Sequence, residues 1–165
     1  MDKIIVIGSP GGGKSHFSRA LSRITGIPVY HMDNLHWRAD KTYGTREELI
    51  EKVNAIIKGD RWIIDGNYNG TLEQRIAACN TVFWLDLPVE VCLEGIRGRI
   101  GTVREDMPWV ETEIDEEFMD FVRDFPTESR PKIVRLLDEY PEKRVIRFSS
   151  RQETEEFLEK LETKR

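Results

Sequence analysis

The sequence has few of the residues that build disulfide frameworks, metal clusters or membrane spans. Its 165 residues include two cysteines and three histidines, and Cys79 and Cys92 show neither C-x-x-C spacing nor a pattern of histidine partners. We expect both to be reduced, buried thiols. No apolar run approaches the roughly 20 residues that a helix needs to cross a bilayer, and the N-terminus lacks a signal-peptide pattern. We therefore expect a cytoplasmic protein without membrane contacts.

An excess of positive charge is also missing. Lysine and arginine total 25 against 30 aspartate and glutamate residues, which gives a net charge of −5. A protein built mainly to hold nucleic acid needs a basic surface, so this balance argues against a nucleic-acid partner and leaves only local basic clusters open. The length and the ordinary share of charged residues predict one compact domain over residues 1–165.

Short apolar segments rich in β-formers recur along the chain, separated by helical patterns. They lie at 4–7, 28–30, 62–64, 81–85 and 145–148. This alternation predicts an α/β fold with a five-stranded parallel sheet. Because the segments are almost wholly apolar, we expect helices to cover both faces of the sheet, which makes three layers.

Capping and first-turn residues mark several helix starts. The candidates are Thr45 with Glu48, Thr71 with Gln74, Pro88, and Ser150 with Glu153. Each pair places a side-chain acceptor before an apolar periodic run. Between about 111 and 140 the pattern is helical but contains Pro126 and Pro131, which predicts two helices with a bend between them.

The most informative motif is the segment Gly-Ser-Pro-Gly-Gly-Gly-Lys-Ser, which follows the first apolar strand and fits G-x-x-x-x-G-K-[ST]. Its glycines let backbone N–H groups turn toward phosphate, Lys14 can reach the β and γ phosphates, and Ser15 offers a hydroxyl to Mg²⁺. The motif predicts a site for ATP and Mg²⁺. The expected nucleotide-binding residues here are Gly8, Ser9, Pro10, Gly11, Gly12, Gly13, Lys14, Ser15 and the following His16.

Two strands deliver a carboxylate at the edge where ligands bind in open α/β sheets. Asp65 follows Trp62-Ile63-Ile64, and Asp86 follows Val82-Phe83-Trp84-Leu85. A hard Mg²⁺ takes oxygen ligands, so Asp65 is the favoured partner of Ser15 at the metal, with Asp86 as the competitor. Either could instead cap the following helix.

The strand near residue 29 leads to Asp33, which we expect to point into the same crevice and to orient or deprotonate an acceptor hydroxyl. A turn aspartate that bonds its own backbone is the alternative. Trp37 could stack on a planar acceptor or fill the core. His31 and His36 flank Asp33, but no cysteine or third histidine completes a metal site with them.

A cationic stretch follows the helix that starts near Pro88. Arg97, Arg99 and Arg104 are interspersed with glycines at 95, 98 and 101. Guanidinium groups neutralise charge on a transferring phosphoryl group, and glycines let a segment close over it. We therefore predict a small flap or lid at about 97–114; a solvated helix end is the alternative.

With these motifs in hand, the chain resembles the adenylate-kinase-like P-loop kinases, and more closely the DNA topology modulation proteins. The resemblance covers nearly the whole chain, through segments 4–15, 29–37, 61–68, 125–131 and the final strand. It implies a P-loop NTPase fold with strand order 2-3-1-4-5, which favours Asp65 over Asp86. It also implies that Arg99 contacts ATP phosphates and that the loop with Ser150 and Arg151 lies beside adenine.

The chain departs from this pattern at two places. His16 stands where these kinases usually have threonine, and Asp65-Gly66-Asn67-Tyr68-Asn69 replaces their Asp-Gly-Phe-Pro-Arg segment. The missing arginine normally holds the phosphate of the acceptor, so an unphosphorylated hydroxyl compound bound by Asp33, Trp37, Asn67 and Tyr68 becomes the favoured acceptor. Arg38, Arg46 or Arg75 could substitute for that arginine, which leaves a nucleoside monophosphate open.

The leading hypothesis is an ATP-dependent kinase in which Lys14, Arg99 and Asp33 are catalytic and the acceptor is an unidentified small molecule. The alternative is a nucleotide-binding regulator that affects DNA topology. The sequence shows no helix-turn-helix pattern, no zinc-finger spacing and no basic face to support it.

Overall fold

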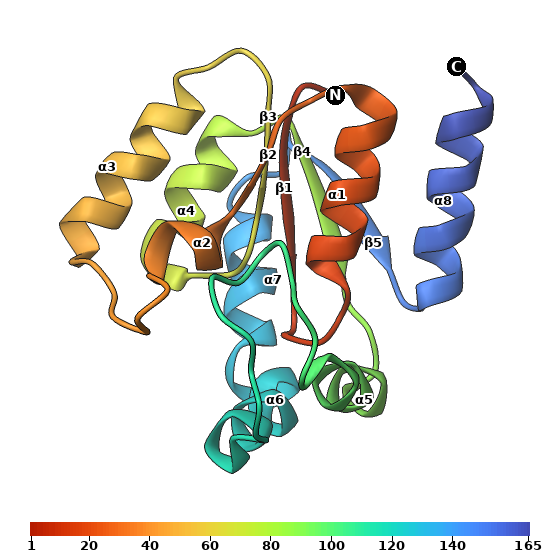
Figure 1. Cartoon of the computed structure of the whole chain (residues 1–165). Coiled ribbons are helices and arrows are strands. Elements are labelled where there is room, and N and C mark those ends of the chain that lie inside the picture. Colours follow the sequence, from red (N-terminus) through yellow and green to blue (C-terminus); the bar gives the residue numbers. More distant parts are fainter.

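The computed structural model describes residues 1–165 as one parallel sheet between layers of helices (Figure 1). The strands are β1 (Lys3–Gly8), β2 (Val29–His31), β3 (Trp62–Asp65), β4 (Thr81–Leu85) and β5 (Arg144–Phe148). Their order is β2-β3-β1-β4-β5, and every neighbouring pair is parallel. The expected α/β class, the five strands and the strand order are confirmed.

Eight helices connect and cover the strands. They are α1 (Lys14–Thr25), α2 (Met32–His36), α3 (Arg46–Ile57), α4 (Asn69–Ala78), α5 (Val89–Arg99), α6 (Glu116–Glu128), α7 (Arg130–Asp138) and α8 (Arg151–Thr163). Figure 1 shows α1 and α8 on one side of the sheet and α3, α4 and α7 on the other. No helix has the length and apolar character that a bilayer span requires.

Each face of the sheet has its own hydrophobic core. On the α1 and α8 face, the ring of Phe17 packs against Phe83, Phe148 and Phe157 with centroid distances of 5.1, 5.5 and 6.2 Å. On the other face, side chains of α3, α4 and α7 pack against Trp62 and the neighbouring strands. This sandwich fixes the carboxyl ends of β1, β2 and β3 side by side, where the loops that follow them can form a site.

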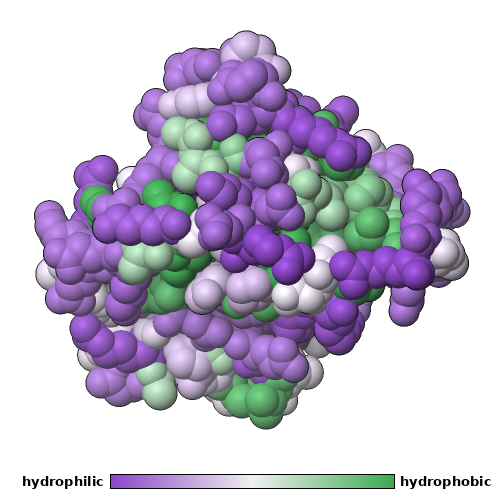
Figure 2. Space-filling view, turned by 90° about the horizontal axis from the view of Figure 1, so that it is seen from above, coloured by the Kyte–Doolittle hydropathy of each residue, from purple (hydrophilic) through white to green (hydrophobic).

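Burial on both faces holds for the inner strands but not for β5. All residues of β3 and β4 are buried, whereas β5 is mostly exposed and Val145 is 40% exposed. The expectation that every strand is covered on both sides is therefore wrong for β5, because an edge strand has one neighbour and less helical cover. Figure 2, which views the end where both termini lie, shows a largely hydrophilic surface with smaller hydrophobic areas.

The N-cap hydrogen bond expected for a capping box forms at two of the three positions, and it does not form at the third. The hydroxyl of Thr45 accepts from the N–H of Glu48 at 3.1 Å, and that of Ser150 accepts from the N–H of Glu153 at 3.2 Å. The expectation for Thr71 is wrong, because α4 already begins at Asn69. The hydroxyl of Thr71 instead donates to the carbonyl of Tyr68 and accepts from the Arg75 side chain.

The proline-containing region forms two helices, as expected. The break lies at Ser129, between α6 and α7. Pro126 is accommodated in the last turn of α6, and Pro131 occupies the first turn of α7, where no backbone N–H is needed. The bend therefore follows from Pro131 starting a new helix.

Arg75 organises the loop between β3 and α4. Its side chain is fully buried, and its guanidinium donates to the carbonyls of Gly66 at 2.7 Å and Tyr68 at 3.3 Å, and also to that of Asn67. Burial lowers the pKa of this guanidinium to about 10, so it stays charged at neutral pH. These bonds hold Tyr68 in the left-handed region at φ 30, a conformation that side chains rarely adopt.

We predict that Arg75→Ala lowers the free energy of unfolding by about 3 kcal/mol or more, because it leaves buried carbonyls without donors and opens a cavity. Urea unfolding followed by circular dichroism measures this change. Arg46→Ala, an exposed arginine on α3, is the control and should change it by less than about 0.5 kcal/mol. Equal effects of the two substitutions would contradict the role given to Arg75.

Candidate functional site

The glycine-rich loop lies between β1 and α1 at the carboxyl end of the sheet. Gly11 and Gly13 have φ values of 80 and 88, which strongly favour glycine. A Cβ on Gly11 would lie 2.0 Å from the carbonyl oxygen of Cys92, so the loop packs directly on α5. The N–H of Gly12 donates to the carbonyl of Ser9 at 3.1 Å and closes the turn.

Lys14 begins α1 and extends over this loop. Its Nζ donates to the carbonyl of Ser9 at 3.0 Å. Desolvation around the ammonium lowers its pKa, and the carboxylates of Asp65 and Asp33 partly offset this effect. Burial has removed water from this ammonium group, so a negative charge bound beside it would stabilise its charged form. The group is therefore suited to bind an anion.

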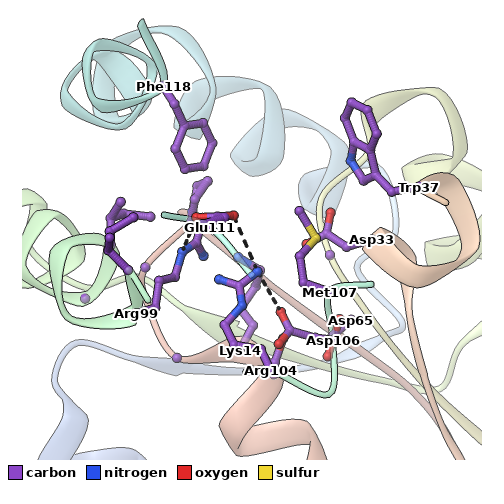
Figure 3. A pocket seen from close by; sticks show the side chains of 18 of the residues that line it. Lys14, Asp33, Trp37, Asp65, Arg99, Arg104, Asp106, Met107, Glu111 and Phe118 are labelled. Atoms are coloured by element: carbon purple, nitrogen blue, oxygen red, sulfur yellow. Dashed lines mark ion pairs between the residues drawn. The ribbon is translucent and has the colours of Figure 1, made fainter. Parts of the chain in front are cut away.

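A cavity of about 830 Å³ opens beside the loop. From the loop it is lined by Pro10, Gly11, Gly13, Lys14, Ser15 and His16. Asp33 and Asp65 reach it from the ends of the neighbouring strands, and the segment 100–115 together with the start of α6 covers it from outside (Figures 1 and 3). The structure therefore brings the phosphate-loop lysine, both predicted carboxylates and a covering segment to one cavity.

Asn67 and Arg151 line the cavity, but their side chains form hydrogen bonds with the backbone of the glycine-rich loop. The side-chain amide of Asn67 accepts from the N–H of Gly8 at 3.1 Å and donates to its carbonyl at 2.6 Å. Arg151 donates to the carbonyl of Gly11 at 3.0 Å. Asn67 is thus a loop anchor and not the free amide expected for an acceptor, while the Ser150 hydroxyl is engaged in capping α8.

Asp65 and Asp86, the two candidates for a metal carboxylate, lie in different surroundings. Asp65 is buried on the cavity wall, and its Oδ2 lies 2.5 Å from Nδ1 of His31. Burial disfavours protonation of His31, but the hydrogen bond and charge of Asp65 outweigh it, so the pKa of His31 is raised.

Asp86 lies outside this cavity and is bound by two arginines. Its carboxylate accepts from Arg130 at 2.9 Å and from Arg147 at 2.7 Å, and both guanidinium groups lie over the ring of Trp84. Although burial raises the pKa of Asp86, the bonds to these arginines outweigh that effect and lower it. Asp86 is therefore neutralised by its neighbours, and Arg130 is engaged away from the cavity.

Asp33 lies at the end of the cavity where the sequence predicts the acceptor. Its Oδ1 accepts a short hydrogen bond from the hydroxyl of Tyr68. Burial raises the pKa of Asp33, with Tyr68 and Lys14 partly opposing the shift. The sequence left two roles open for Trp37, stacking on an acceptor or filling the core. Its side chain is half-buried on the cavity wall and belongs to neither core. It packs against Tyr43 and Trp109.

The cationic stretch differs in part from the expected flap. α5 continues to Arg99, so Gly95 lies inside this helix. A glycine is needed there because a Cβ would lie 2.2 Å from the carbonyl oxygen of Gly11. This glycine serves close packing, not flexibility. Arg97 is exposed and does not line the cavity, so its expected contact with nucleotide finds no support. The irregular segment is 100–115.

Besides Arg151, three arginines line the cavity, and each comes from a different element. Arg19 comes from α1, Arg99 from the end of α5 and Arg104 from the covering segment. Arg99 Nε lies 3.5 Å from Glu111, and Arg104 Nη2 lies 3.7 Å from the same carboxylate (Figure 3). These separations are too long for good hydrogen bonds.

Asp106 completes this ionic cluster. It lies 3.8 Å from Nη1 of Arg19 and 3.6 Å from Nη2 of Arg104. As a result, one buried nitrogen on each of the three arginines has no hydrogen-bond partner: Arg19 Nη1, Arg99 Nε and Arg104 Nη2. Burial and the neighbouring Arg104 lower the pKa of Arg99.

Sequence reasoning missed Arg19, Asp106, Glu111 and Trp109. Arg19 lies four residues after Ser15, so helical spacing places it on the same face of α1 and could have identified it. The other three belong to a segment without periodicity, which carries no signal in the sequence. The proposed substitutes Arg38, Arg46 and Arg75 do not line the cavity.

The chain matches no protein-family model and no curated protein. Among solved structures, it is similar to shikimate kinase from Bacteroides thetaiotaomicron, with 18% identity, a TM-score of 0.57, and coverage of 97% of this chain and 96% of the other. It is also similar to shikimate kinase from Acinetobacter baumannii in complex with shikimate, with 14% identity, a TM-score of 0.63, and coverage of 100% and 95%. At these identities the similarity establishes a shared fold with these two structures.

We predict that Asp65→Asn raises the Mg²⁺ concentration needed for nucleotide binding about 10- to 100-fold, because it removes a charge beside the expected ion. Asp86→Asn should change it little, since that carboxylate is bound to two arginines outside the cavity. Titration of Mg²⁺ at fixed ATP, followed by calorimetry, measures both. A larger effect of Asp86→Asn would show that the wrong strand was chosen.

Proposed function

We propose that the protein is a kinase that transfers the γ-phosphoryl group of ATP to a hydroxyl of a small molecule. The observation that carries this proposal is the set of buried, unpartnered nitrogens on Arg19, Arg99 and Arg104 around the cavity of the phosphate loop. Buried polar atoms nearly always have partners in native proteins. Phosphate oxygens would supply these partners, in the geometry that guanidinium groups favour.

The donor side is supported by the loop and its neighbours. The N–H groups of the loop, the N-terminus of α1 and Lys14 would bind the triphosphate. The loop with Ser150 and Arg151 follows β5 and reaches the same cavity, which supports its assignment beside adenine. In this arrangement Arg151 both fixes the loop and borders the nucleotide.

The residues present also fit a magnesium ion. Mg²⁺ keeps several waters and takes few protein ligands, so one hydroxyl and one carboxylate suffice beside phosphate oxygens. Ser15 and Asp65 line the same cavity, and His31 fixes Asp65 by a hydrogen bond to one oxygen. Bound there, the ion would neutralise charge on the phosphates. His31 would hold the carboxylate in position.

Asp33 is the proposed base for the acceptor. The attacking hydroxyl would give its proton to Asp33 as its oxygen forms a bond to the γ-phosphorus, and the bond from that phosphorus to the bridging oxygen would break to release ADP. Burial raises the pKa of Asp33, which makes its carboxylate a better proton acceptor. Tyr68 holds one carboxylate oxygen and leaves the other for the substrate.

We further propose that 97–114 acts as a lid in a single domain. Glu111 and Asp106 now lie beside the arginines that phosphates would contact, so nucleotide binding would exchange these carboxylates for phosphate oxygens. The sequence resemblance to adenylate-kinase-like kinases agrees with such a lid. The closer resemblance to DNA topology modulation proteins stays a prediction, and no observation favours the regulator alternative.

Lys14→Ala is the direct test of the proposed function. We expect turnover to fall about 100-fold or more, because the substitution removes a charge that stabilises the transferring group. ADP release from ATP and Mg²⁺ is followed across nucleosides, nucleotides, sugars and hydroxy acids. Lys160→Ala, an exposed position on α8, is the control, and circular dichroism checks that both variants fold. A folded Lys14→Ala protein with wild-type turnover would refute the proposal.

Asp33→Asn should reduce turnover about 100-fold while leaving ATP binding within about twofold, because the amide cannot accept the hydroxyl proton. Burial favours the protonated acid, so the pKa of Asp33 lies above the ordinary value for an aspartate. Wild-type turnover should therefore fall as the pH drops through this raised pKa, because the base becomes protonated. The variant should lose this acidic limb. Turnover against pH and calorimetry with ATP measure the two effects, and an unchanged pH profile in Asp33→Asn would exclude Asp33 as the base.

A further inference from the structure

Two tryptophan side chains, Trp37 and Trp109, line the part of the cavity next to Asp33. The rings of Trp37 and Trp109 meet edge to face with centroids 5.4 Å apart, and Tyr68 lies beside them on the same wall. Phe118 lies apart from them, with the guanidinium of Arg99 over its ring at 5.5 Å from the centroid (Figure 3). Trp37 and Trp109 are only half-buried and belong to neither core, so their exposed ring surface faces the cavity, whereas Phe118 and Tyr68 also pack against the two cores.

The same region offers little to bind an anionic acceptor. Arg38 forms an ion pair with Glu48 outside the cavity, and the guanidinium of Arg75 donates its hydrogen bonds to backbone carbonyls. The remaining cation at this end is Lys41, whose Nζ lies over the ring of Trp109 at 6.0 Å from its centroid. Asp33 has no cationic hydrogen-bond partner, so an acceptor carrying a phosphate or carboxylate would meet repulsion there.

Apart from Lys41, the cations that line the cavity are accounted for by the donor in the proposed function. Lys14 extends over the phosphate loop, and Arg19, Arg99 and Arg104 form one cluster with the lid carboxylates. In the proposed function this cluster meets the triphosphate of ATP. The chemistry left for the acceptor is a pair of tryptophan faces beside one hydrogen-bonding carboxylate.

We infer that the acceptor is an uncharged aromatic heterocycle that carries a hydroxyl group, as a nucleoside does. This inference rests on the proposed function and names its substrate class. The ring would stack on the Trp37 and Trp109 wall, and the hydroxyl would bond to Asp33. Stacking on aromatic side chains is favourable for any base, whereas a sugar or hydroxy acid alone has no planar π-face and gains less from this wall.

The test compares adenosine and thymidine with AMP, ribose and shikimate, first by calorimetry without ATP and then as acceptors with ATP and Mg²⁺. We expect the nucleosides to bind at least about tenfold more tightly than the other three compounds and to be phosphorylated. Preferred binding of AMP or shikimate would overturn the inference.

Variants of Trp109 separate stacking from a structural role. Trp109→Leu should raise the KM of the nucleosides about tenfold and leave the KM of ATP unchanged, and Trp109→Phe should recover most of the loss. Lys160→Ala, at an exposed position outside the cavity, is the control and should change the nucleoside KM by less than about twofold. If Trp109→Leu folds as the wild type does, by circular dichroism, and its KM for the nucleosides is unchanged, the inference is contradicted.

The outcomes also separate this inference from the function on which it rests. If nucleosides bind in a Trp109-dependent way but receive no phosphate from ATP, the acceptor class stands and the kinase proposal fails. If ATP phosphorylates ribose or shikimate and not the nucleosides, the kinase proposal stands and the acceptor class is wrong.

Discussion

The rest of the site depends on the Gly8–Ser15 loop being clamped between three other parts of the fold. α5 lies so close that a Cβ on Gly11 would meet a backbone oxygen at 2.0 Å, Arg151 holds the loop from α8, and Asn67 binds its first residue. Because these contacts use the backbone of the loop, its shape is set before any ligand binds. A preformed cradle of N–H groups avoids the cost of ordering a loop on binding.

Charge balance governs the remainder of the cavity. Arg19, Arg99 and Arg104 form a cluster at its donor side, and Glu111 and Asp106 lie near enough to offset them without forming good hydrogen bonds. Carboxylates at 3.5 to 3.8 Å stabilise the cations while leaving their N–H groups unsatisfied. Such a cluster can exchange one set of anionic oxygens for another at little net cost, which suits a lid that opens and closes on phosphates.

Much of this architecture could be predicted from the sequence, because its signals are local. Apolar strands, the glycine-rich loop and the capping residues Thr45 and Ser150 are encoded within a few neighbouring residues and appear where expected. The capping pattern at Thr71 fails because α4 begins two residues earlier, at Asn69, so the Thr71 hydroxyl lies inside the helix and bonds to Tyr68 and Arg75. Asn67 could not be assigned from the sequence for a different reason, because its partner Gly8 lies 59 positions away.

The lid was the least predictable part of the site. Gly95 was interpreted as a hinge, although its role in the structure is close packing against the loop, which only the three-dimensional contact reveals. Glu111, Asp106 and Trp109 lie in a segment without periodicity, so their place over the cavity depends on how α5 and α6 are set against the sheet. Arg19 was accessible from helical spacing.

The most direct measurement is a crystal structure with Mg²⁺ and a non-hydrolysable ATP analogue. The account predicts that Arg99 and Arg104 separate from Glu111, now 3.5 and 3.7 Å away, and form hydrogen bonds to phosphate oxygens. Lys14 should at the same time leave the Ser9 carbonyl for the β and γ phosphates. A structure in which the analogue is bound while both arginines keep their contacts with Glu111 would contradict it.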